Sequence, residues 1–177
     1  MKLYVIRHGR TKCNDEGKYN GSFDEDINET GIEQANEASK IVRNLDIDLI
    51  VCSPLLRTRH TCEIVNVNNI PVIYDDRIKE RECGSLTCKD LGDFYQTDYW
   101  NYYSKVEVDG LESISCLFDR VKQFLDEVKE KYKDKNILIV THGGVARGIY
   151  FYFNEIPEDG MIEQFGSSNC GIKEYEI

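Results

Sequence analysis

Long apolar runs and paired metal-binding motifs are both missing from this sequence of 177 residues. No stretch approaches the roughly 20 consecutive apolar residues that a membrane-spanning helix needs. Neither a Cys-x-x-Cys pair nor a His-x-x-x-His pair occurs, so the common zinc-ligand spacings are missing too. We therefore expect no membrane partner, no metal site and no cofactor.

Disulfide pairing is not indicated either. The chain has seven cysteines, an odd number, and 41% of its residues are hydrophobic, which is enough for a core without covalent cross-links. Its first residues enter an apolar strand-like run directly, unlike a signal peptide. These features predict free thiols and a cytoplasmic location. Cys13 lies near the candidate site described below and is a candidate for oxidation, without a catalytic role of its own.

Positive charge is scarce, with 22 Lys and Arg against 32 Asp and Glu and a formal net charge of −10. Nucleic acids and anionic membranes bind through clustered cations, so we expect neither as a partner. A phosphorylated substrate would also be repelled at long range, so a phosphate site must be a local cluster of arginines. The length suits one globular domain, residues 1–177, and is short for two.

Strand-like and helix-like segments alternate along the chain. Short apolar runs predict strands at Lys2–Ile6, Asp48–Cys52, Pro71–Tyr74, Asn136–Thr141 and Gly171–Ile177. Helical spacing and capping residues predict helices from Thr30 (a capping box with Glu33) to Leu45, from Ser53-Pro54 to Val65, from Ser113 to Lys133 and from Gly144 to Asn154. The alternation predicts an α/β fold, a three-layer sandwich whose mostly parallel central sheet carries helices on both faces.

Three of these strands are followed directly by polar residues, namely His8, Ser53 and His142. Open parallel sheets bind ligands at the carboxyl ends of their strands, so these side chains are expected to converge at one edge. An apolar strand followed by His-Gly occurs twice, at His8-Gly9 and at His142-Gly143. The repetition makes a functional site far more plausible than either motif alone.

The residue types suit phosphoryl transfer. A neutral imidazole attacks phosphorus well near pH 7, and a guanidinium group matches phosphate oxygens with a planar fork of donors. We therefore interpret His8 as the nucleophile and Arg7 and Arg57 as phosphate clamps. His142 is a further donor, and the two glycines, Gly9 and Gly143, allow backbone N–H groups to approach the phosphate.

Four ordered segments resemble the histidine phosphatase superfamily, in the branch that includes cofactor-dependent phosphoglycerate mutases. They are Arg7-His8-Gly9 with Asn14 downstream, Cys52-Ser53-Pro54-Leu55-Leu56-Arg57-Thr58 with threonine where the family has alanine, Arg77-Ile78-Lys79-Glu80-Arg81 with Gly84 downstream, and Thr141-His142-Gly143-Gly144. Each tripeptide alone is a weak signal, but four in order over essentially the whole chain are specific. The resemblance implies a phosphoglycerate mutase-like fold and a phosphohistidine formed on His8.

The resemblance also implies a proton donor. Glu80 would protonate the leaving alkoxide, a contribution of about 10²–10⁴-fold for a positioned acid. Glu82 is a rival, because in an extended segment both side chains point to the same face; the motif alignment favours Glu80. Asn14 stands at the position of the family's phosphate-side asparagine. Arg10, two residues beyond the nucleophile, is a further candidate for substrate binding.

The segment 84–111 is the least regular part of the chain and is rich in aromatic residues, which makes it either a cap over the site or a part of the core. Mutases of this family carry a longer basic insertion here, whereas residues 82–119 contain only Lys89 and Lys105 besides acidic and neutral side chains. We therefore expect a hydrolase acting on a small phosphomonoester.

Three other functions remain open at this stage. A phosphoglycerate mutase and a phosphohistidine-protein phosphatase would use the same residues. A non-catalytic interaction domain is also possible, but every catalytic position that can be aligned is filled. The sequence does not identify the leaving group of the substrate or the oligomeric state, although the last strand and the surface aromatics would suit a dimer.

Overall fold

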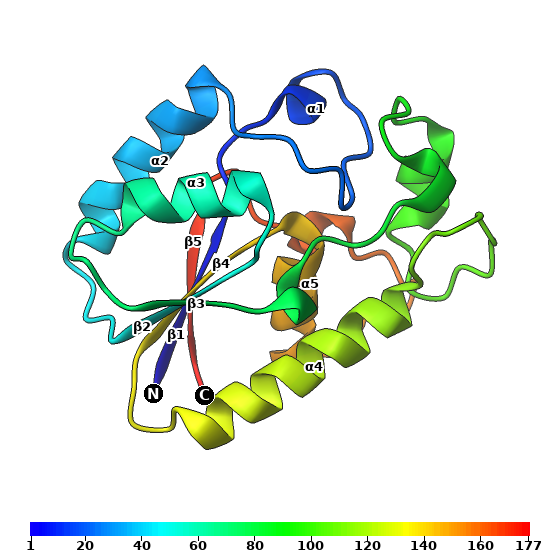
Figure 1. Cartoon of the computed structure of the whole chain (residues 1–177). Coiled ribbons are helices and arrows are strands. Elements are labelled where there is room, and N and C mark those ends of the chain that lie inside the picture. The colour runs from blue at the N-terminus through cyan, green and yellow to red at the C-terminus, as the bar shows by residue number, and fades with distance from the viewer.

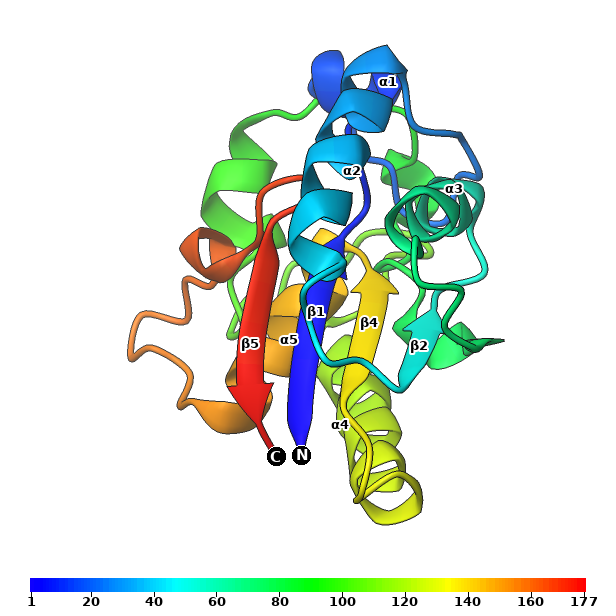
Figure 2. The ribbon, with the colours of Figure 1, turned by 90° about the vertical axis from the view of Figure 1, so that its left-hand side faces the viewer.

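The computed structural model describes residues 1–177 and contains a five-stranded sheet with the strand order β3-β2-β4-β1-β5. The strands are β1 (Lys2–Arg7), β2 (Leu49–Cys52), β3 (Val72–Tyr74), β4 (Ile137–Thr141) and β5 (Ile172–Glu176). The first four run parallel, and β5 pairs antiparallel with β1. Figure 2 shows β5, β1, β4 and β2 side by side. The predicted strands are confirmed to within one residue at each end.

Helices cover both faces of this sheet. The helices are α1 (Lys12–Asp15), α2 (Glu29–Val42), α3 (Leu56–Val65), α4 (Ile114–Lys131) and α5 (Gly143–Phe153), and the cover is provided by α2 to α5. Successive strand residues point to opposite faces, so Tyr4 and Ile6 pack with α2 and α3 while Leu3 and Val5 pack with α4 and α5. Figure 1 shows the strands between these two helix pairs. The expected α/β sandwich with a mostly parallel sheet is confirmed.

Two predicted helix starts are wrong. Helix α2 begins at Glu29, because the Asn28 side chain accepts a hydrogen bond from the Gly31 N–H at 2.9 Å and takes the capping place assigned to Thr30. Helix α3 begins at Leu56 rather than after Ser53. Its Leu56 N–H donates to the Asp24 carboxylate at 2.7 Å, a cap supplied from a distant loop that local spacing cannot predict.

The strand register brings the polar residues at the strand ends together. Arg7 is paired with Thr141 across β1 and β4, so the next residues, His8 and His142, follow side by side. The His8 N–H donates to the Thr141 carbonyl at 2.9 Å, and the Ser53 N–H donates to the Val140 carbonyl at 3.0 Å. Three strands therefore deliver His8, Ser53 and His142 to one edge of the sheet, as the sequence predicted.

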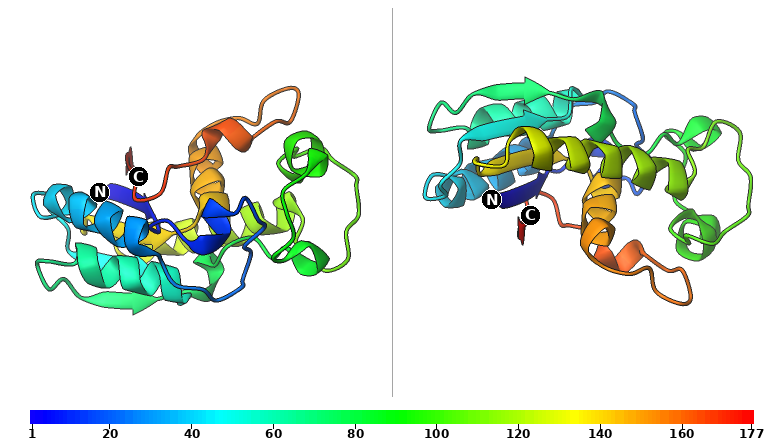
Figure 3. Two further views of the ribbon diagram at one scale, coloured as in Figure 1. Left: turned by 90° about the horizontal axis from the view of Figure 1, so that it is seen from above. Right: turned by 90° about the horizontal axis from the view of Figure 1, so that it is seen from below.

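The cap segment, residues 84–111, stands out from the sheet beyond the N-terminal end of α4 (Figure 3). It contains a 3₁₀ turn at Gly84–Leu86 and a π-helical turn at Tyr95–Tyr99. Tyr99 and Trp100 are each 4% exposed and belong to the same hydrophobic cluster as the buried side chains of α4 and α5. Part of the cap is thus core, and its predicted function as a lid stays a prediction. None of the helices is long and apolar enough to cross a membrane.

Candidate active site

His8 lies at the end of β1 with its side chain almost fully buried, at 2% exposure. Its Nδ1 atom is 2.7 Å from the Gly9 carbonyl oxygen. A carbonyl can only accept, so Nδ1 must carry the proton and Nε2 must carry the free lone pair. The backbone thus fixes the tautomer in which Nε2 is the nucleophilic nitrogen.

Arg7 and Arg57 lie beside His8 and are held by backbone carbonyl groups. Arg57 donates from Nη1 to the Phe23 carbonyl at 2.8 Å and from Nη2 to the Gly21 carbonyl at 2.7 Å. Arg7 donates from Nη1 to the Ser167 carbonyl at 2.8 Å. Burial lowers the pKa of both guanidinium groups, but arginine starts from so high a value that both keep their charge.

His142 lies behind His8, with the two ring centroids 5.2 Å apart. Its Nε2 atom is 2.7 Å from the Ser53 hydroxyl, and we assign the hydroxyl as the donor of this hydrogen bond. The Nδ1 atom of His142 then carries the N–H. Burial, and next the charge of Arg57, hold the pKa of both His8 and His142 well below the usual 6.5. Both imidazoles are therefore neutral near pH 7.

Several buried donors around His8 have no hydrogen-bond partner within the protein. They include the Nε atoms of Arg7 and Arg57 and the Nδ1 atom of His142. An unpaired buried polar group costs free energy, and native proteins keep few of them. Three donors that belong to neighbours of His8 would be satisfied by the oxygens of a tetrahedral anion. The arrangement therefore fits a phosphoryl group better than a neutral ligand.

Glu80 lies across the cavity at the N-terminus of α5. Its Oε1 atom accepts from the Arg81 N–H at 2.8 Å and from the Gly144 N–H at 3.0 Å, whereas Oε2 has only a longer contact of 3.3 Å with the same Gly144 N–H. A Cβ on Gly144 would lie 2.3 Å from Oε1, so only glycine allows this approach. With Oε1 occupied by two donors, Oε2 is the oxygen that is free to carry a transferable proton.

The structure distinguishes Glu80 from Glu82, which the sequence alone could not do. Residues 79–83 form no strand, so the expected same-face alternation does not apply. Glu82 turns away to accept from the Ser22 hydroxyl and from the Cys83 N–H at 2.9 Å. Glu80 lines the cavity with His8, and Glu82 does not. The geometry therefore favours Glu80 as the acid.

Arg120 on α4 holds the segment that carries Glu80. Its Nη1 atom donates to the carbonyls of Arg77 and Lys79 (at 2.5 and 2.8 Å), and its Nη2 atom donates to that of Glu80 at 3.2 Å. The Glu112 carboxylate pairs with Arg120 at 2.7 Å. The Glu112–Arg120 bracket therefore shapes a segment that has no strand hydrogen bonds of its own.

The cavity at these residues has a volume of about 280 Å³. Most of the predicted site residues line it, namely Arg7, His8, Arg10, Asn14, Arg57, Glu80 and Gly143. Gly9 and the fully buried His142 do not. The Gly9 N–H donates to the Thr61 hydroxyl at 3.0 Å, and a Cβ on Gly9 would lie 2.5 Å from the Gly31 carbonyl oxygen. Gly9 thus permits close packing against α2, and its contact with phosphate stays a prediction.

Asn14 and Arg10 occupy the mouth of the cavity. The Asn14 side chain accepts from the Thr11 N–H at 3.3 Å, while Thr11 caps the same short helix in return. The half-exposed Arg10 is paired with Asp15. Both line the cavity, and neither geometry alone assigns a contact with phosphate.

Other residues also line or support the site, and apart from Trp100 in the aromatic cap segment no sequence pattern indicated them. The Asn169 side-chain amide donates to the His8 carbonyl at 3.0 Å, and the Cys170 N–H donates to the Arg7 carbonyl at 2.9 Å. The Trp100 Nε1 atom and the Asn20 Oδ1 atom are buried without partners, and both residues line the cavity. These side chains come from loops without periodicity, so only the folded chain reveals them.

Arg147 on α5 makes contacts that hold it within the fold. The guanidinium group lies 4.2 Å from the Trp100 ring centroid and donates from Nη2 to the Glu163 carbonyl at 2.6 Å. It nevertheless borders the cavity. No group of three or more His, Cys, Asp or Glu side chains is arranged to hold a metal ion.

A family model and individual proteins match this chain. The model of the histidine phosphatase superfamily (branch 1) matches residues 3–177. Phosphoserine phosphatase 1 of Hydrogenobacter thermophilus is 30% identical, over 100% of this chain and 85% of that protein. The uncharacterized phosphatase PhoE of Bacillus subtilis is 33% identical, over 98% of this chain and 93% of that protein.

The similarity of the fold to solved structures supports the same family. The crystal structure of phosphoserine phosphatase from Entamoeba histolytica, in complex with 3-phosphoglyceric acid, superposes with a TM-score of 0.84 at 27% identity. That match covers 98% of this chain and 89% of the other. Sequence motifs, family match and fold agree over essentially the full length: the chain belongs to branch 1 of the histidine phosphatase superfamily and is a phosphatase.

Proposed function

We propose that this enzyme hydrolyses small phosphomonoesters through a phosphohistidine on His8. The observation that carries the proposal is the position of His8: its free Nε2 atom lies in the buried cluster that also holds the unpartnered donors of Arg7, Arg57 and His142. This nucleophile has unpartnered hydrogen-bond donors around it that can bind an anion. Such an arrangement suits phosphoryl transfer, because catalysis of that reaction depends mainly on positioning and charge stabilisation.

In the first step, His8 Nε2 attacks phosphorus and forms the N–P bond while the bond from phosphorus to the leaving oxygen breaks. Glu80 gives the proton on Oε2 to that oxygen, which departs as an alcohol. Arg7 and Arg57 stabilise the charge on the non-bridging oxygens. The N–H groups at the start of α5 add the positive end of its dipole.

In the second step, the Glu80 carboxylate takes a proton from water as the water oxygen attacks phosphorus. The N–P bond breaks, inorganic phosphate leaves, and His8 recovers its lone pair. Glu80 is then protonated again, and the cycle is balanced without any redox partner. We propose no metal and no other cofactor, so activity is expected to survive EDTA.

Hydrolysis is favoured over mutase chemistry by the cap. A mutase must grip an anionic substrate while it returns the phosphate, and that needs cations on the cap. Neither Lys89 nor Lys105, the two cap lysines, borders the cavity that holds His8. Several relatives are also named for hydrolysis, including the H. thermophilus phosphoserine phosphatase and the alpha-ribazole phosphatase of Escherichia coli. These names suggest a small phosphorylated metabolite for this chain as well.

The proposal is tested by trapping the phosphoenzyme. Purified protein is mixed with ³²P-labelled phosphomonoester, quenched in alkali and then exposed to acid. We expect an alkali-stable, acid-labile label that His8→Ala abolishes together with turnover, while the control His60→Ala, on the surface of α3, keeps both. Absence of any label in the active wild-type enzyme under rapid quenching would contradict a covalent intermediate on histidine.

A second measurement separates the alternatives. Hydrolysis of p-nitrophenyl phosphate is compared with interconversion of 3- and 2-phosphoglycerate. Faster interconversion would identify a mutase and overturn the assignment as a hydrolase. Activity on a phosphohistidine-containing protein with none on small esters would point instead to a protein phosphatase.

A further inference from the structure

A second cavity, of about 450 Å³, lies between the cap segment and the N-terminus of α4. It is distinct from the cavity of His8, because the two have no lining residue in common. Arg81, Tyr99 and Trp100 stand between them: Arg81 borders the second cavity, and the two aromatic residues border the first. The proposed reaction gives this second space no role.

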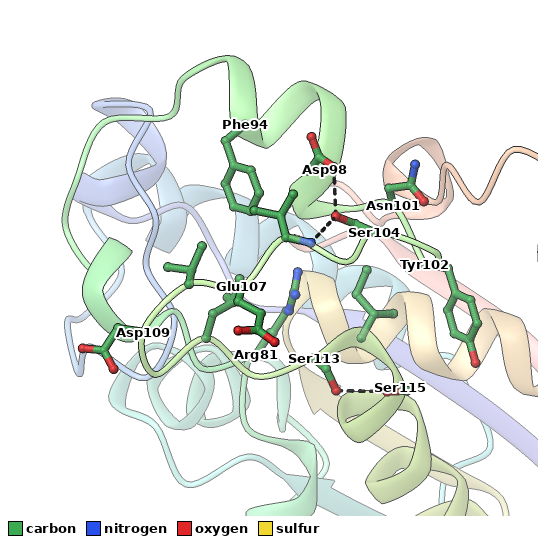
Figure 4. A pocket seen from close by; sticks show the side chains of 14 residues that line it. Arg81, Phe94, Asp98, Asn101, Tyr102, Ser104, Glu107, Asp109, Ser113 and Ser115 are labelled. Carbon is green, nitrogen blue, oxygen red and sulfur yellow. Dashed lines mark hydrogen bonds between the residues drawn. The ribbon is translucent and has the colours of Figure 1, made fainter.

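Arg81 brings a positive charge without an ion-pair partner to this cavity. The residue is only 4% exposed, and Figure 4 shows its guanidinium group directed into the space. Its Nε atom donates to the Glu112 carbonyl at 2.7 Å and its Nη1 atom to the Tyr99 carbonyl, whereas Nη2 has no partner. None of the ion pairs of the protein includes Arg81. The guanidinium carbon instead lies 4.4 Å from the Tyr99 ring centroid and 5.4 Å from that of Trp100, so aromatic faces stabilise the charge and Nη2 is left as the donor open to a carboxylate.

The N-terminus of α4 adds to this attraction. Ser113, the N-cap residue, and Ser115 in the first turn line the cavity, and that turn holds no acidic residue that would neutralise the helix dipole. The two serine hydroxyls are hydrogen-bonded to each other at 3.0 Å (Figure 4). Arg81 and this helix end therefore favour negative charge on the same side of the cavity.

The opposite charge lies on the cap side. Glu107 and Asp109 line the cavity, are exposed at its rim and take part in no ion pair. Asp98 is different, because its carboxylate already accepts from the Thr97 hydroxyl at 2.7 Å and from the Ser104 hydroxyl at 2.8 Å. The lining of this cavity thus includes two carboxylates without an ion pair, and they would receive an ammonium group.

Apolar side chains fill the rest of the lining, among them Phe94, Val106 and Leu111. A plain anion would meet the two rim carboxylates and the net charge of −10. A zwitterion avoids that repulsion and can place each of its charges opposite a complementary one. We propose that this cavity binds a free α-amino acid with an apolar side chain: its carboxylate at Arg81 and the start of α4, its ammonium at Glu107 and Asp109.

The test is a calorimetric titration of the full-length protein with L-phenylalanine and L-leucine. The matched probes are phenethylamine, which lacks the carboxylate, and 3-phenylpropanoate, which lacks the ammonium group. We expect one of the amino acids to bind and the two probes to bind at least about tenfold more weakly, the scale of one charge-assisted hydrogen bond. The titration does not depend on turnover, so its result is independent of the proposed reaction.

Glu107→Gln is the decisive variant, because this exposed side chain makes no hydrogen bond that holds the fold. We expect it to weaken amino acid binding about tenfold while hydrolysis is unchanged, and Arg81→Lys to weaken binding similarly by loss of the planar fork. Glu37→Gln on α2 is the control and should bind as wild type. The proposal is overturned if neither amino acid binds up to its solubility limit, if a probe binds as tightly as its parent, or if Glu107→Gln leaves the affinity unaltered.

Discussion

The Glu80 carboxylate accepts a hydrogen bond from the Gly144 N–H at 3.0 Å, so the residue assigned as the acid is held by the helix that begins directly after His142. The acid and the second histidine are therefore positioned by one structural element. This contact depends on the missing side chain at position 144, where a Cβ would lie 2.3 Å from Glu80 Oε1.

Gly144→Ala should displace Glu80 and remove proton donation to the leaving group. We expect turnover of alkyl phosphates to fall by roughly 10²-fold, the lower range for loss of a general acid. Nitrophenyl phosphate, whose leaving group needs no proton, should be affected far less. Steady-state kinetics on both esters test this, with Gly92→Ala as the control, because a Cβ at Gly92 meets nothing within 4 Å. Equal losses on both esters would mean that Glu80 is not the acid.

Arg120→Met should loosen the Glu112–Arg120 bracket and with it the position of Glu80. We expect the same preference for nitrophenyl over alkyl esters, with partial recovery in Arg120→Lys. The free energy of unfolding should also fall by about 1–3 kcal/mol, because carbonyl groups lose a charged donor. Lys122→Met, on the same helix and paired only with Asp126, is the control for lost charge. A variant that loses stability but keeps the wild-type ratio of the two esters would limit Arg120 to a structural role.

Stability should decrease as the pH falls below about 6.5, the pKa of histidine in an unfolded chain. Burial depresses the pKa of His8 and His142 in the folded state, so below that pH the unfolded chain binds more protons than the folded one. Each imidazole then contributes a slope of up to ~1.4 kcal/mol per pH unit, and the contribution is fully present above the unfolded pKa.

Urea unfolding at several pH values between about 7.5 and 5 measures this slope. His8→Asn should reduce it, and His60→Asn controls for the loss of an imidazole from the surface. A slope that is identical in wild type and in His8→Asn would contradict the assignment to buried histidines.

Cys13 should resist modification although it borders the cavity of His8. Burial and the nearby Glu25 carboxylate raise the pKa of its thiol to about 12, so almost no thiolate exists at neutral pH. This lowers the oxidation tendency expected from the sequence. Iodoacetamide labelling followed by mass spectrometry should modify the exposed Cys88 and Cys116 first. Preferential labelling of Cys13 would show that the thiol is activated.

The sequence predicted those site residues that follow buried strands, because strand ends are set by local hydrophobicity. His8 and His142 belong to this class. Glu80 came only from the resemblance to a family, since its segment has no periodic pattern and its shape is set by Arg120 from a distant helix. The predicted N-cap of α2 was wrong for a local reason. Asn28 competes with Thr30 for the capping position, and its side chain accepts the hydrogen bond from the Gly31 N–H.

Ser53 was misplaced for another physical reason. Its hydroxyl was expected to cap α3 but is hydrogen-bonded to His142. This tertiary contact overrides the local capping preference. Asn169 was not predicted at all, because loop residues become neighbours of His8 only after long-range folding. Trp100 differs, since it belongs to the aromatic segment 84–111 that was expected to be a cap or core. Gly9 was predicted to approach a ligand. The structure shows its backbone packed closely against that of Gly31, a role that looks the same in sequence, and its contact with phosphate stays a prediction.

Residues 167–170 support the beginning of the chain: the Ser167 carbonyl holds Arg7, and Asn169 holds the backbone of His8. A nascent polypeptide that has left the ribosome only as far as α5 contains all the catalytic side chains but lacks these supports. The enzyme should therefore be inactive during translation and become active only when residues 167–170 leave the ribosome and bind to Arg7 and His8. Ribosome-stalled chains of increasing length would then gain activity abruptly rather than gradually.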